Sequence, residues 1–201
     1  MKIKDVYFLK SCKNIADFPD YQYPEIAFMG RSNVGKSSLI NMLMSKKNLV
    51  KTGSKPGVTK TINFFILNHA ISIADLPGYG YANVPLKLKK TFLPLIRRYI
   101  MNRINLKLAF FLIDIRRIPD RIEIELLSLL AGNKIPVAIT LTKCDKVSRN
   151  RLSQYIKNIS KQLGIDSGRL FITSAKTLSG KKELLGLIAE YSSGTVRNGG
   201  F

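Results

Sequence analysis

The fold of this chain can be predicted from one segment, Glu25-Ile-Ala-Phe-Met-Gly-Arg-Ser-Asn-Val-Gly-Lys-Ser37. Residues 25–29 form a short apolar run that ends in a glycine, which is typical of a buried strand that leads into a turn. Residues 30–37 match the pattern Gly-x-x-x-x-Gly-Lys-Ser, and residues 36–45 then have the apolar spacing of a helix. A strand, a glycine loop and a helix in this order predict a loop that binds phosphate.

The residue types in this loop suit phosphate chemistry. The glycines let the backbone curl so that its N–H groups face a β-phosphate, and the helix N-terminus adds partial positive charge. We expect the Lys36 ammonium to reach the β- and γ-phosphates and the Ser37 hydroxyl to bind Mg²⁺. The alternative is a glycine turn with a surface lysine, and the flanking strand and helix disfavour it. The predicted phosphate-binding residues are Gly30, Arg31, Ser32, Asn33, Val34, Gly35, Lys36, Ser37 and Ser38.

A second motif, Asp75-Leu-Pro-Gly78, follows an apolar run at residues 70–74. A carboxylate at the end of a strand can hold Mg²⁺ through a water, and the Gly78 N–H can swing onto a γ-phosphate. Residues 46–60, rich in Lys, Ser, Gly and Pro, predict a mobile loop between the two motifs. One threonine of such a loop can close over Mg²⁺, and Thr52, Thr59 and Thr61 are rivals on spacing alone.

Two further segments predict a pocket for guanine. In Thr142-Lys-Cys-Asp145 a buried carboxylate can accept hydrogen bonds from two N–H donors on one edge of guanine, a pairing that adenine cannot make. We expect Lys143 to lie along the base and Cys144 to be a packed thiol, and we expect a backbone N–H of Ser174-Ala-Lys176 to bind the guanine oxygen. The predicted base-pocket residues are Thr142, Lys143, Cys144, Asp145, Thr173, Ser174, Ala175 and Lys176.

The remaining periodicity predicts an α/β fold, the P-loop NTPase fold of a Ras-like G domain. Its mostly parallel central sheet should carry helices on both faces, with every motif at the carboxyl end of a strand. We expect further strands at residues 61–67, 70–74, 106–113, 135–141 and 170–173, and helices at 85–104, 119–130, 149–163 and 181–191. Asn68-His69 predicts a hairpin, with His69 as a solvated turn residue rather than a catalytic base. Pro94 should kink its helix or delay its start, and Pro119 and Gly132 should bracket theirs. An edge strand at 6–9 is left open.

Composition fits one soluble domain with a polyanionic partner. The 201 residues are 45% hydrophobic, and 33 Lys and Arg against 13 acidic residues give a net charge of +20. Such an excess points to nucleic acid or to an anionic membrane surface. Cys12 and Cys144 make no disulfide framework, the N-terminus lacks a signal-peptide core, and the longest apolar run is too short to span a membrane. We divide the chain into an N-terminal extension (1–24), a domain (25–191) and a disordered basic tail (192–201).

The motifs together resemble the EngB (YihA/YsxC) family of ribosome-biogenesis GTP-binding proteins, in the TrmE-Era-EngA-like group. The matching stretches are residues 28–41, 55–65 and 75–82, with Asp114-Ile-Arg116 and the Thr142–Asp145 motif. The family usually has His where this chain has Arg117, and often a Trp about where Phe92 stands. The resemblance favours Thr59 as the magnesium-linked threonine. It implies nucleotide contacts from Gly57, Val58, Thr59, Lys60, Thr61, Asp75, Leu76, Pro77 and Gly78, catalytic roles for Lys36, Thr59 and Gly78, and magnesium ligation by Ser37, Thr59 and Asp75.

The resemblance also implies a role in the cell. It predicts a bacterial cytoplasmic GTPase, a monomer, that assists late assembly of the large ribosomal subunit by contact with rRNA and ribosomal proteins, and that is needed for normal division and septation. A GTP-gated binding module of the division machinery, without a ribosome role, is the alternative. Recruitment to a membrane surface is disfavoured because no amphipathic basic helix with aromatic anchors is visible. Candidate RNA contacts are the basic clusters Lys87, Lys89, Lys90, Arg97, Arg98 and Arg116, Arg117, Arg121.

Slow hydrolysis is a further expectation. Many GTPases place a Gln just after the DxxG glycine to orient the attacking water, and this chain has Tyr79 there. Some GTPases with an apolar residue at this position use K⁺ bound by a phosphate-loop Asn, to which Asn33 corresponds. Asn33 can equally serve only to stabilise the turn, because Asn is common in turns. Both interpretations of Asn33 remain open.

Overall fold

The computed structural model describes residues 1–50, 61–80 and 86–194, with side chains in the first helix after residue 85 described from Phe92 onward. The strands are β1 (Val6–Cys12), β2 (Glu25–Gly30), β3 (Ile62–Leu67), β4 (Ile71–Asp75), β5 (Leu106–Asp114), β6 (Val137–Thr142) and β7 (Leu170–Ile172). The helices are α1 (Lys36–Leu43), α2 (Leu86–Asn102), α3 (Arg121–Gly132), α4 (Arg149–Leu163) and α5 (Lys181–Ser192). Short 3-10 turns η1 (Ile15–Asp17), η2 (Cys144–Lys146) and η3 (Ser167–Arg169) join them.

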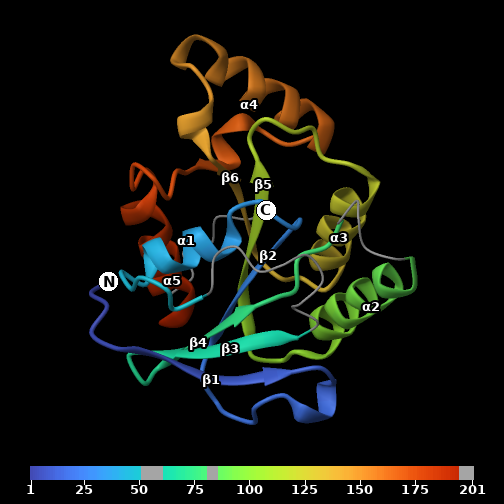
Figure 1. Cartoon of the computed structure of the whole chain (residues 1–201), viewed down its shortest axis with the longest axis vertical. Helices are drawn as coiled ribbons and strands as arrows, with labels where there is room; N and C mark the ends of the chain where they lie inside the picture. Colours follow the sequence, from blue (N-terminus) through green and yellow to red (C-terminus); the bar gives the residue numbers. More distant parts are fainter. Residues whose placement is uncertain (51–60, 81–85, 195–201) are drawn as a thin grey trace.

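The strands form one seven-stranded sheet in the order β1-β3-β4-β2-β5-β6-β7. The pairs from β4 to β7 are parallel, whereas β3 is antiparallel to both β4 and β1. The predicted α/β fold with a mostly parallel sheet is therefore confirmed. Parallel strands place their carboxyl ends at one edge, and β2, β4, β6 and β7 each end there in a predicted motif (Figure 1).

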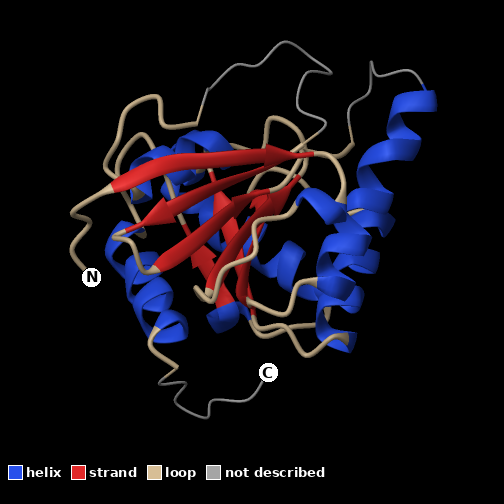
Figure 2. Ribbon diagram, turned by 90° about the horizontal axis from the view of Figure 1, so that it is seen from below, coloured by secondary structure: helices blue, strands red, loops and turns tan. Residues whose placement is uncertain are grey.

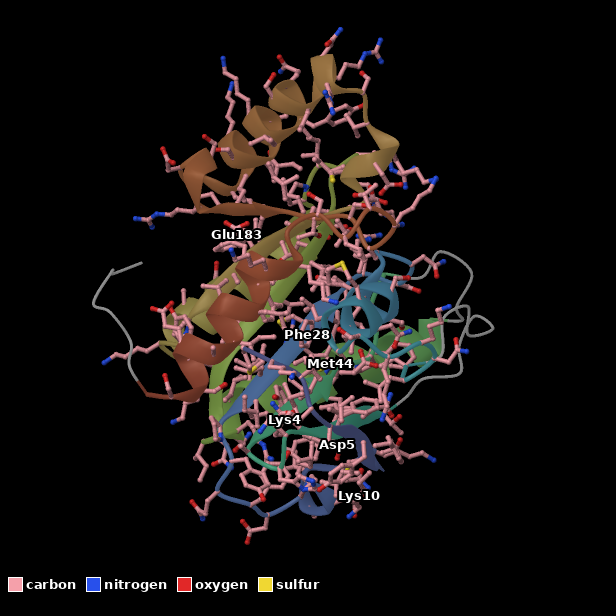
Figure 3. The ribbon with its side chains drawn as sticks, turned by 90° about the vertical axis from the view of Figure 1, so that its left-hand side faces the viewer. Lys4, Asp5, Lys10, Phe28, Met44 and Glu183 are labelled. Carbon is pink, nitrogen blue, oxygen red and sulfur yellow. The ribbon has the colours of Figure 1, made fainter. Side chains whose placement is uncertain are left out.

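Helices cover both faces of the sheet, as predicted (Figure 2). Neighbouring residues of a strand point to opposite faces, so Phe110 of β5 packs with α1 and α5 whereas Phe111 packs with α2, α3 and α4. On the first face the rings of Phe28 and Phe110 stack with centroids 4.9 Å apart. Figure 3 looks onto this face, where Phe28 and Met44 are labelled. Buried apolar residues on both faces account for strands that read as continuous apolar runs.

The edge strand that the sequence did not settle is present, and it is longer than residues 6–9. β1 pairs with β3 from Val6 opposite Leu67 to Cys12 opposite Ile62, with an irregularity between Phe8 and Lys10. The predicted hairpin between β3 and β4 is confirmed, because Asn68 and His69 both adopt left-handed backbone angles (φ 52° and 54°). His69 is exposed at this turn, as expected of a solvated residue.

Several helix boundaries differ from the sequence expectation, and α1 and α2 each end two residues earlier than expected, at Leu43 and Asn102. α3 begins at Arg121 rather than at Pro119, because Asp120 caps it: its carboxylate accepts from two backbone N–H groups while Glu123 bonds back to the Asp120 N–H. Gly132 is the last residue of α3 rather than the residue after it. α2 starts at Leu86, well before Pro94, so the proline does not delay it. No helix in the described ranges is long and apolar enough to cross a membrane.

The predicted tail overlaps the last helix by one residue, because α5 continues to Ser192. The last stretch of the predicted tail, residues 195–201, lies outside the described residues.

Candidate functional site

The phosphate loop curls between β2 and α1 as the glycine pattern predicts. Asn33 and Gly35 both have positive φ, 61° and 105°, and the helix begins at once with Lys36. The Gly35 angle lies in the left-handed region, where a side chain would be strained. The loop therefore presents its backbone and the N-terminus of α1 to the same space. Phosphate binding at this point needs no rearrangement of the helix.

Three of the residues predicted to bind magnesium or phosphate lie close together at the start of α1. Lys36 forms an ion pair with Asp75, which stands at the end of β4, and both side chains are largely buried. Asn63 of β3 also approaches Asp75, with 3.5 Å between its Nδ2 and the carboxylate oxygen. Ser37 is half-buried beside them. A serine hydroxyl and a carboxylate are hard oxygen donors, so these residues fit a site for Mg²⁺.

The Asp75–Gly78 motif lies directly against the phosphate loop. The Ser32 N–H donates to the Tyr79 carbonyl across 2.7 Å, and Arg31 and Tyr79 form a parallel bridge. A Cβ on Gly78 would stand 3.0 Å from the Ser32 Cα, closer than side chains normally come to backbone. A side chain at position 78 would therefore force the two loops to shift by a few tenths of an ångström.

The Tyr79 side chain points away from the phosphate site into the core. The residue is 2% exposed and packs in the hydrophobic cluster that α2 and α3 cover. Its hydroxyl has no hydrogen-bond partner among the described residues, and burial raises its pKa well above the ordinary value. Tyr79 thus cannot orient a water at the γ-phosphate, in agreement with the sequence expectation.

Arg31 also turns its side chain away from the phosphate loop. Its guanidinium forms an ion pair with Asp120, the cap of α3, and donates to the Gly80 carbonyl at 3.3 Å. Any contact of Arg31 with a nucleotide is left to its backbone. The side chain instead links three segments, namely the phosphate loop, the segment after Gly78 and the start of α3.

A pocket opens beside the loop, between the start of α1 and the turns that follow β6 and β7. It collects most of the predicted base-contacting residues in one place. Its lining consists of Gly35, Ser38, Leu39, Thr142, Lys143, Asp145, Lys146, Thr173, Ala175 and Lys176.

Asp145 is held in this pocket by Ser174. The buried Ser174 hydroxyl donates to the Asp145 carboxylate at 2.7 Å and accepts from the Lys176 and Thr177 N–H groups at 3.2 Å. The hydrogen bond from Ser174 lowers the pKa of Asp145 below its ordinary value. Asp145 is half-buried rather than buried as we expected, because one side of it faces the open pocket.

The base pocket is tied to the phosphate loop. The Lys143 ammonium donates to the Asn33 carbonyl and pairs with Asp114 at 3.0 Å, and the Thr142 hydroxyl donates to the Val34 carbonyl at 2.6 Å. Burial would raise the pKa of Asp114, but hydrogen bonds from Arg116 and Lys143 outweigh it and lower the pKa to about 2. The fixed charge of Asp114 therefore orients Lys143 between the two halves of the site.

Other predicted residues are placed differently. Cys144 is half-buried against the core and does not line the pocket; burial raises the pKa of its thiol, which agrees with a packed thiol. The Leu76 side chain lies in the core. Thr61 is half-buried and its hydroxyl donates to Asn63 at 3.2 Å. Gly57, Val58, Thr59 and Lys60 lie outside the described residues, so their roles remain predictions.

Sequence reasoning missed three participants: Leu39 and Lys146 in the pocket lining, and Asp114 as the partner of Lys143. Asp114 could have been found, because it is a carboxylate at the carboxyl end of a central strand. The sequence pattern predicts Leu39 only as a core residue of its helix and does not distinguish Lys146 from other surface lysines.

Known proteins resemble this chain along most of its length. Residues 25–143 match the family model described as "50S ribosome-binding GTPase". The "Probable GTP-binding protein EngB" of Desulforapulum autotrophicum is 47% identical over 92% of this chain and 95% of its own length. The same-named protein of Flavobacterium johnsoniae is 43% identical over 98% and 96%. A crystal structure of a probable GTP-binding protein EngB superposes with a TM-score of 0.70 at 25% identity, over 85% of this chain and 99% of that one.

Proposed function

Because the chain belongs to the EngB family of GTP-binding proteins and is a GTPase, we propose that it is a magnesium-dependent switch in late assembly of the large ribosomal subunit. We place it in the bacterial cytoplasm, as a monomer, with a further link to cell division and septation. The proposed role in assembly, the location, the monomeric state and the link to division rest on the resemblance to the family. The net charge of +20 supports a partner rich in phosphate.

One observation carries the proposed nucleotide chemistry, namely the joining of the base pocket to the phosphate loop through Lys143 and Thr142. A guanine held by Asp145 then fixes where the triphosphate lies over the loop. Lys36 would exchange its partner Asp75 for the β- and γ-phosphates. Ser37, with Asp75 through a water and Thr59, would hold Mg²⁺, which neutralises charge on the phosphate oxygens.

In the reaction a water attacks the γ-phosphorus, the bond to the β–γ bridging oxygen breaks, and GDP and phosphate leave. Lys36 and the loop N–H groups stabilise the charge that develops on the phosphate oxygens. The Gly78 N–H would bind the γ-phosphate and so report its presence. We expect slow turnover without an activator, because the buried Tyr79 cannot position the water.

Asn33 offers two interpretations, and a measurement separates them. Its left-handed backbone suits an Asn that stabilises a turn, and its exposed side chain is also free to bind K⁺. If Asn33 binds K⁺, GTP turnover should be faster in potassium than in sodium buffer, and Asn33→Ala should abolish the difference. Equal rates in the two buffers would leave Asn33 with only the turn role.

The ribosome role is tested by co-sedimentation of the chain with purified large-subunit particles, with GDP or with a non-hydrolysable GTP analogue. We expect binding that is stronger with the analogue and weaker with rising salt. Binding that ignores both salt and nucleotide would count against this role and favour the alternative, a GTP-gated module of the division machinery.

A further inference from the structure

Helix α4 presents an unusual outer surface. Its sequence, Arg-Asn-Arg-Leu-Ser-Gln-Tyr-Ile-Lys-Asn-Ile-Ser-Lys-Gln-Leu, contains no acidic residue. Arg149, Ser153, Lys157 and Lys161 are spaced four residues apart, so they form a stripe along the helix, and all are exposed. A parallel stripe next to it carries exposed amides from Asn150, Gln154, Asn158 and Gln162. We call these the basic stripe and the amide stripe of α4.

The basic stripe is not neutralised within the described part of the protein. No carboxylate there forms an ion pair with Arg149, Lys157 or Lys161. The basic clusters proposed from the sequence differ, because two of their arginines have carboxylate partners. Arg97 pairs with Glu125 of α3, and Arg116 is bonded to Asp114. The Lys87, Lys89 and Lys90 side chains lie outside the described residues.

The stripe serves the stability of the fold only at its end, because Lys161 stands in the last turn of α4, where the helix dipole favours positive charge. Arg149 and Arg151 stand in the first turn of α4, where the helix dipole disfavours positive charge by about 0.3–1 kcal/mol per residue. The helix also lacks a side-chain hydrogen bond at its cap, Ser148. What holds α4 on the sheet is its inner face, on which Ile159 is buried. Basic residues that destabilise the start of their own helix, with no carboxylate partner in the described ranges, suggest a ligand outside the molecule.

We propose that the exposed face of α4 binds the phosphate backbone of RNA. This rests on the proposed ribosome role and names the surface that would serve it. Cations spaced along one line can pair with successive phosphates, and the amide stripe can donate to phosphates and to ribose hydroxyls. Gln154 and Asn158 already bond to each other at 2.7 Å, which aligns them along the helix.

The chemistry of the face favours RNA over other polyanions. A helix that docks on a membrane carries exposed aromatic or large aliphatic anchors, and a protein interface has an apolar centre. The large exposed apolar residues of the described chain include none from α4. Leu152, Tyr155 and Ile156 pack against the core instead.

The position of α4 predicts how nucleotide affects this contact. α4 follows β6 and the Asp145 turn, whereas the Asp75–Gly78 motif follows β4 on the other side of β2 and β5 (Figure 1). No described bond joins α4 to that motif. The α4 face should therefore contribute equally in the GTP and GDP states, and nucleotide gating should arise elsewhere.

The test compares two full-length triple variants with the same loss of charge. The α4 variant carries Arg149→Gln, Lys157→Gln and Lys161→Gln. The control carries Lys13→Gln, Lys107→Gln and Lys182→Gln, which are exposed residues of other faces. A third variant, Gln154→Ala with Asn158→Ala, removes the bonded amides without changing charge. Each is measured for GTP affinity, for binding to a mixed-sequence RNA duplex and to large-subunit particles across a salt series, and for binding to vesicles of anionic lipid.

We expect the α4 variant to lose at least about tenfold in RNA affinity, in both nucleotide states, with the slope of log affinity against log salt smaller by about three. The control should keep the slope of the unsubstituted chain. The amide variant should bind RNA several-fold more weakly at an unchanged slope, and GTP affinity should be unchanged throughout.

The outcomes separate the inference from the ribosome role. If the unsubstituted chain binds particles and both triple variants bind them alike, the α4 inference is wrong and the ribosome role stands. If only the α4 variant binds the RNA duplex more weakly, but neither the unsubstituted chain nor any variant binds large-subunit particles, the inference stands and the ribosome role is wrong. If the parent binds neither, both are wrong. Loss of vesicle binding alone would assign α4 to a membrane and overturn the inference.

Discussion

Asp145 is the residue that we expect to set the identity of the ligand. Its carboxylate is oriented by the hydrogen bond from Ser174, which also lowers its pKa, and Ser174 is itself fixed by two backbone N–H groups. An ionised carboxylate is an acceptor only, so it matches two N–H donors on one edge of a base. Guanine has that edge and adenine does not, which makes selectivity depend on a carboxylate rather than on the shape of the pocket.

The substitution Asp145→Asn tests this directly. The amide should lower GTP and GDP affinity about 100-fold or more, because two charge-assisted hydrogen bonds are lost and a donor faces a donor. Xanthine nucleotides, whose ring carbonyl can pair with the new amide, should be partly accepted. Titration calorimetry measures both effects, and Asp166→Asn, at an exposed aspartate, is the matched control. Unchanged GTP affinity in Asp145→Asn would refute the assignment of the base pocket.

At the scale of elements, the contact between the phosphate loop and the Asp75–Gly78 motif couples two segments that lie far apart in the sequence. Glycine at position 78 permits this close contact, since a methyl group there would come within 3.0 Å of the Ser32 Cα. Arg31 extends the link to the cap of α3. Movement of the motif toward a γ-phosphate therefore has to change the packing of the phosphate loop.

We expect Gly78→Ala to slow GTP hydrolysis on the order of 10–100-fold, because it displaces the motif from the phosphate loop. GDP affinity should change much less, since the γ-phosphate contact is absent there. Single-turnover hydrolysis and GDP titration measure the two effects. Gly186→Ala in α5, where a methyl group would enter open space, is the control and should leave turnover unaltered. Normal turnover in Gly78→Ala would show that the close approach has no catalytic role.

The opposite end of the sheet is held by a buried charge network between β2 and the end of α2. Glu25 is fully buried and accepts hydrogen bonds from Nε and Nη2 of Arg103, at 2.8 and 2.9 Å, and from the hydroxyls of Tyr21 and Tyr99 at 2.7 Å. The Arg103 guanidinium also lies over the Phe18 ring, 5.9 Å from its centroid. The N-terminal extension is thereby fastened to the helix that follows the Asp75–Gly78 motif.

Breaking this network should be strongly destabilising. Arg103→Ala leaves the Glu25 carboxylate buried without a countercharge, and we expect the free energy of unfolding to fall by about 3–5 kcal/mol. Arg98→Ala, on the exposed side of the same helix, should change it by less than about 0.5 kcal/mol. Urea unfolding measures both variants. A loss in Arg103→Ala no larger than in Arg98→Ala would mean that the network contributes little.

For the whole molecule, the candidate site draws on both halves of the sheet. Its groups come from the ends of β2, β4, β6 and β7, so a nucleotide that binds there stabilises all of them together. The proposed RNA-binding face of α4 lies outside this site. The proposed nucleotide contacts and RNA contacts therefore use different residues, so we expect that each can be removed by mutation without loss of the other.

Saturation with GTP and Mg²⁺ should raise the midpoint of thermal unfolding. At about 100 times the dissociation constant the stabilisation is about 2.7 kcal/mol, which corresponds to about 5–10 °C for a domain of this size. Chelation of Mg²⁺ should remove a large part of the shift. Ser37→Ala should show the same small shift with and without the metal. A GTP-induced shift that is indifferent to both changes would contradict the magnesium assignment.

From the amino-acid sequence alone we could predict the phosphate loop, the order of strands and helices and the family resemblance, because these depend on local patterns: glycine spacing, apolar periodicity and short motifs. It also placed the motifs at one edge of the sheet, since parallel strands leave no other arrangement. Helix ends were less predictable. In α3, Pro119 suggested the first helical residue, whereas Asp120 caps the helix and places its start at Arg121.

The contacts between distant residues could be learned only from the folded structure. The pairing of β1 with β3, the turn of Arg31 toward Asp120, the burial of Tyr79 and the bond from Ser174 to Asp145 all join residues far apart in the chain or depend on how helices cover the sheet. It also distinguished neutralised from free cations: Arg97 and Arg116 have carboxylate partners, whereas the basic stripe of α4 has none in the described ranges. Charge counts along a sequence cannot make that distinction, because neutralisation depends on distances that only folding fixes.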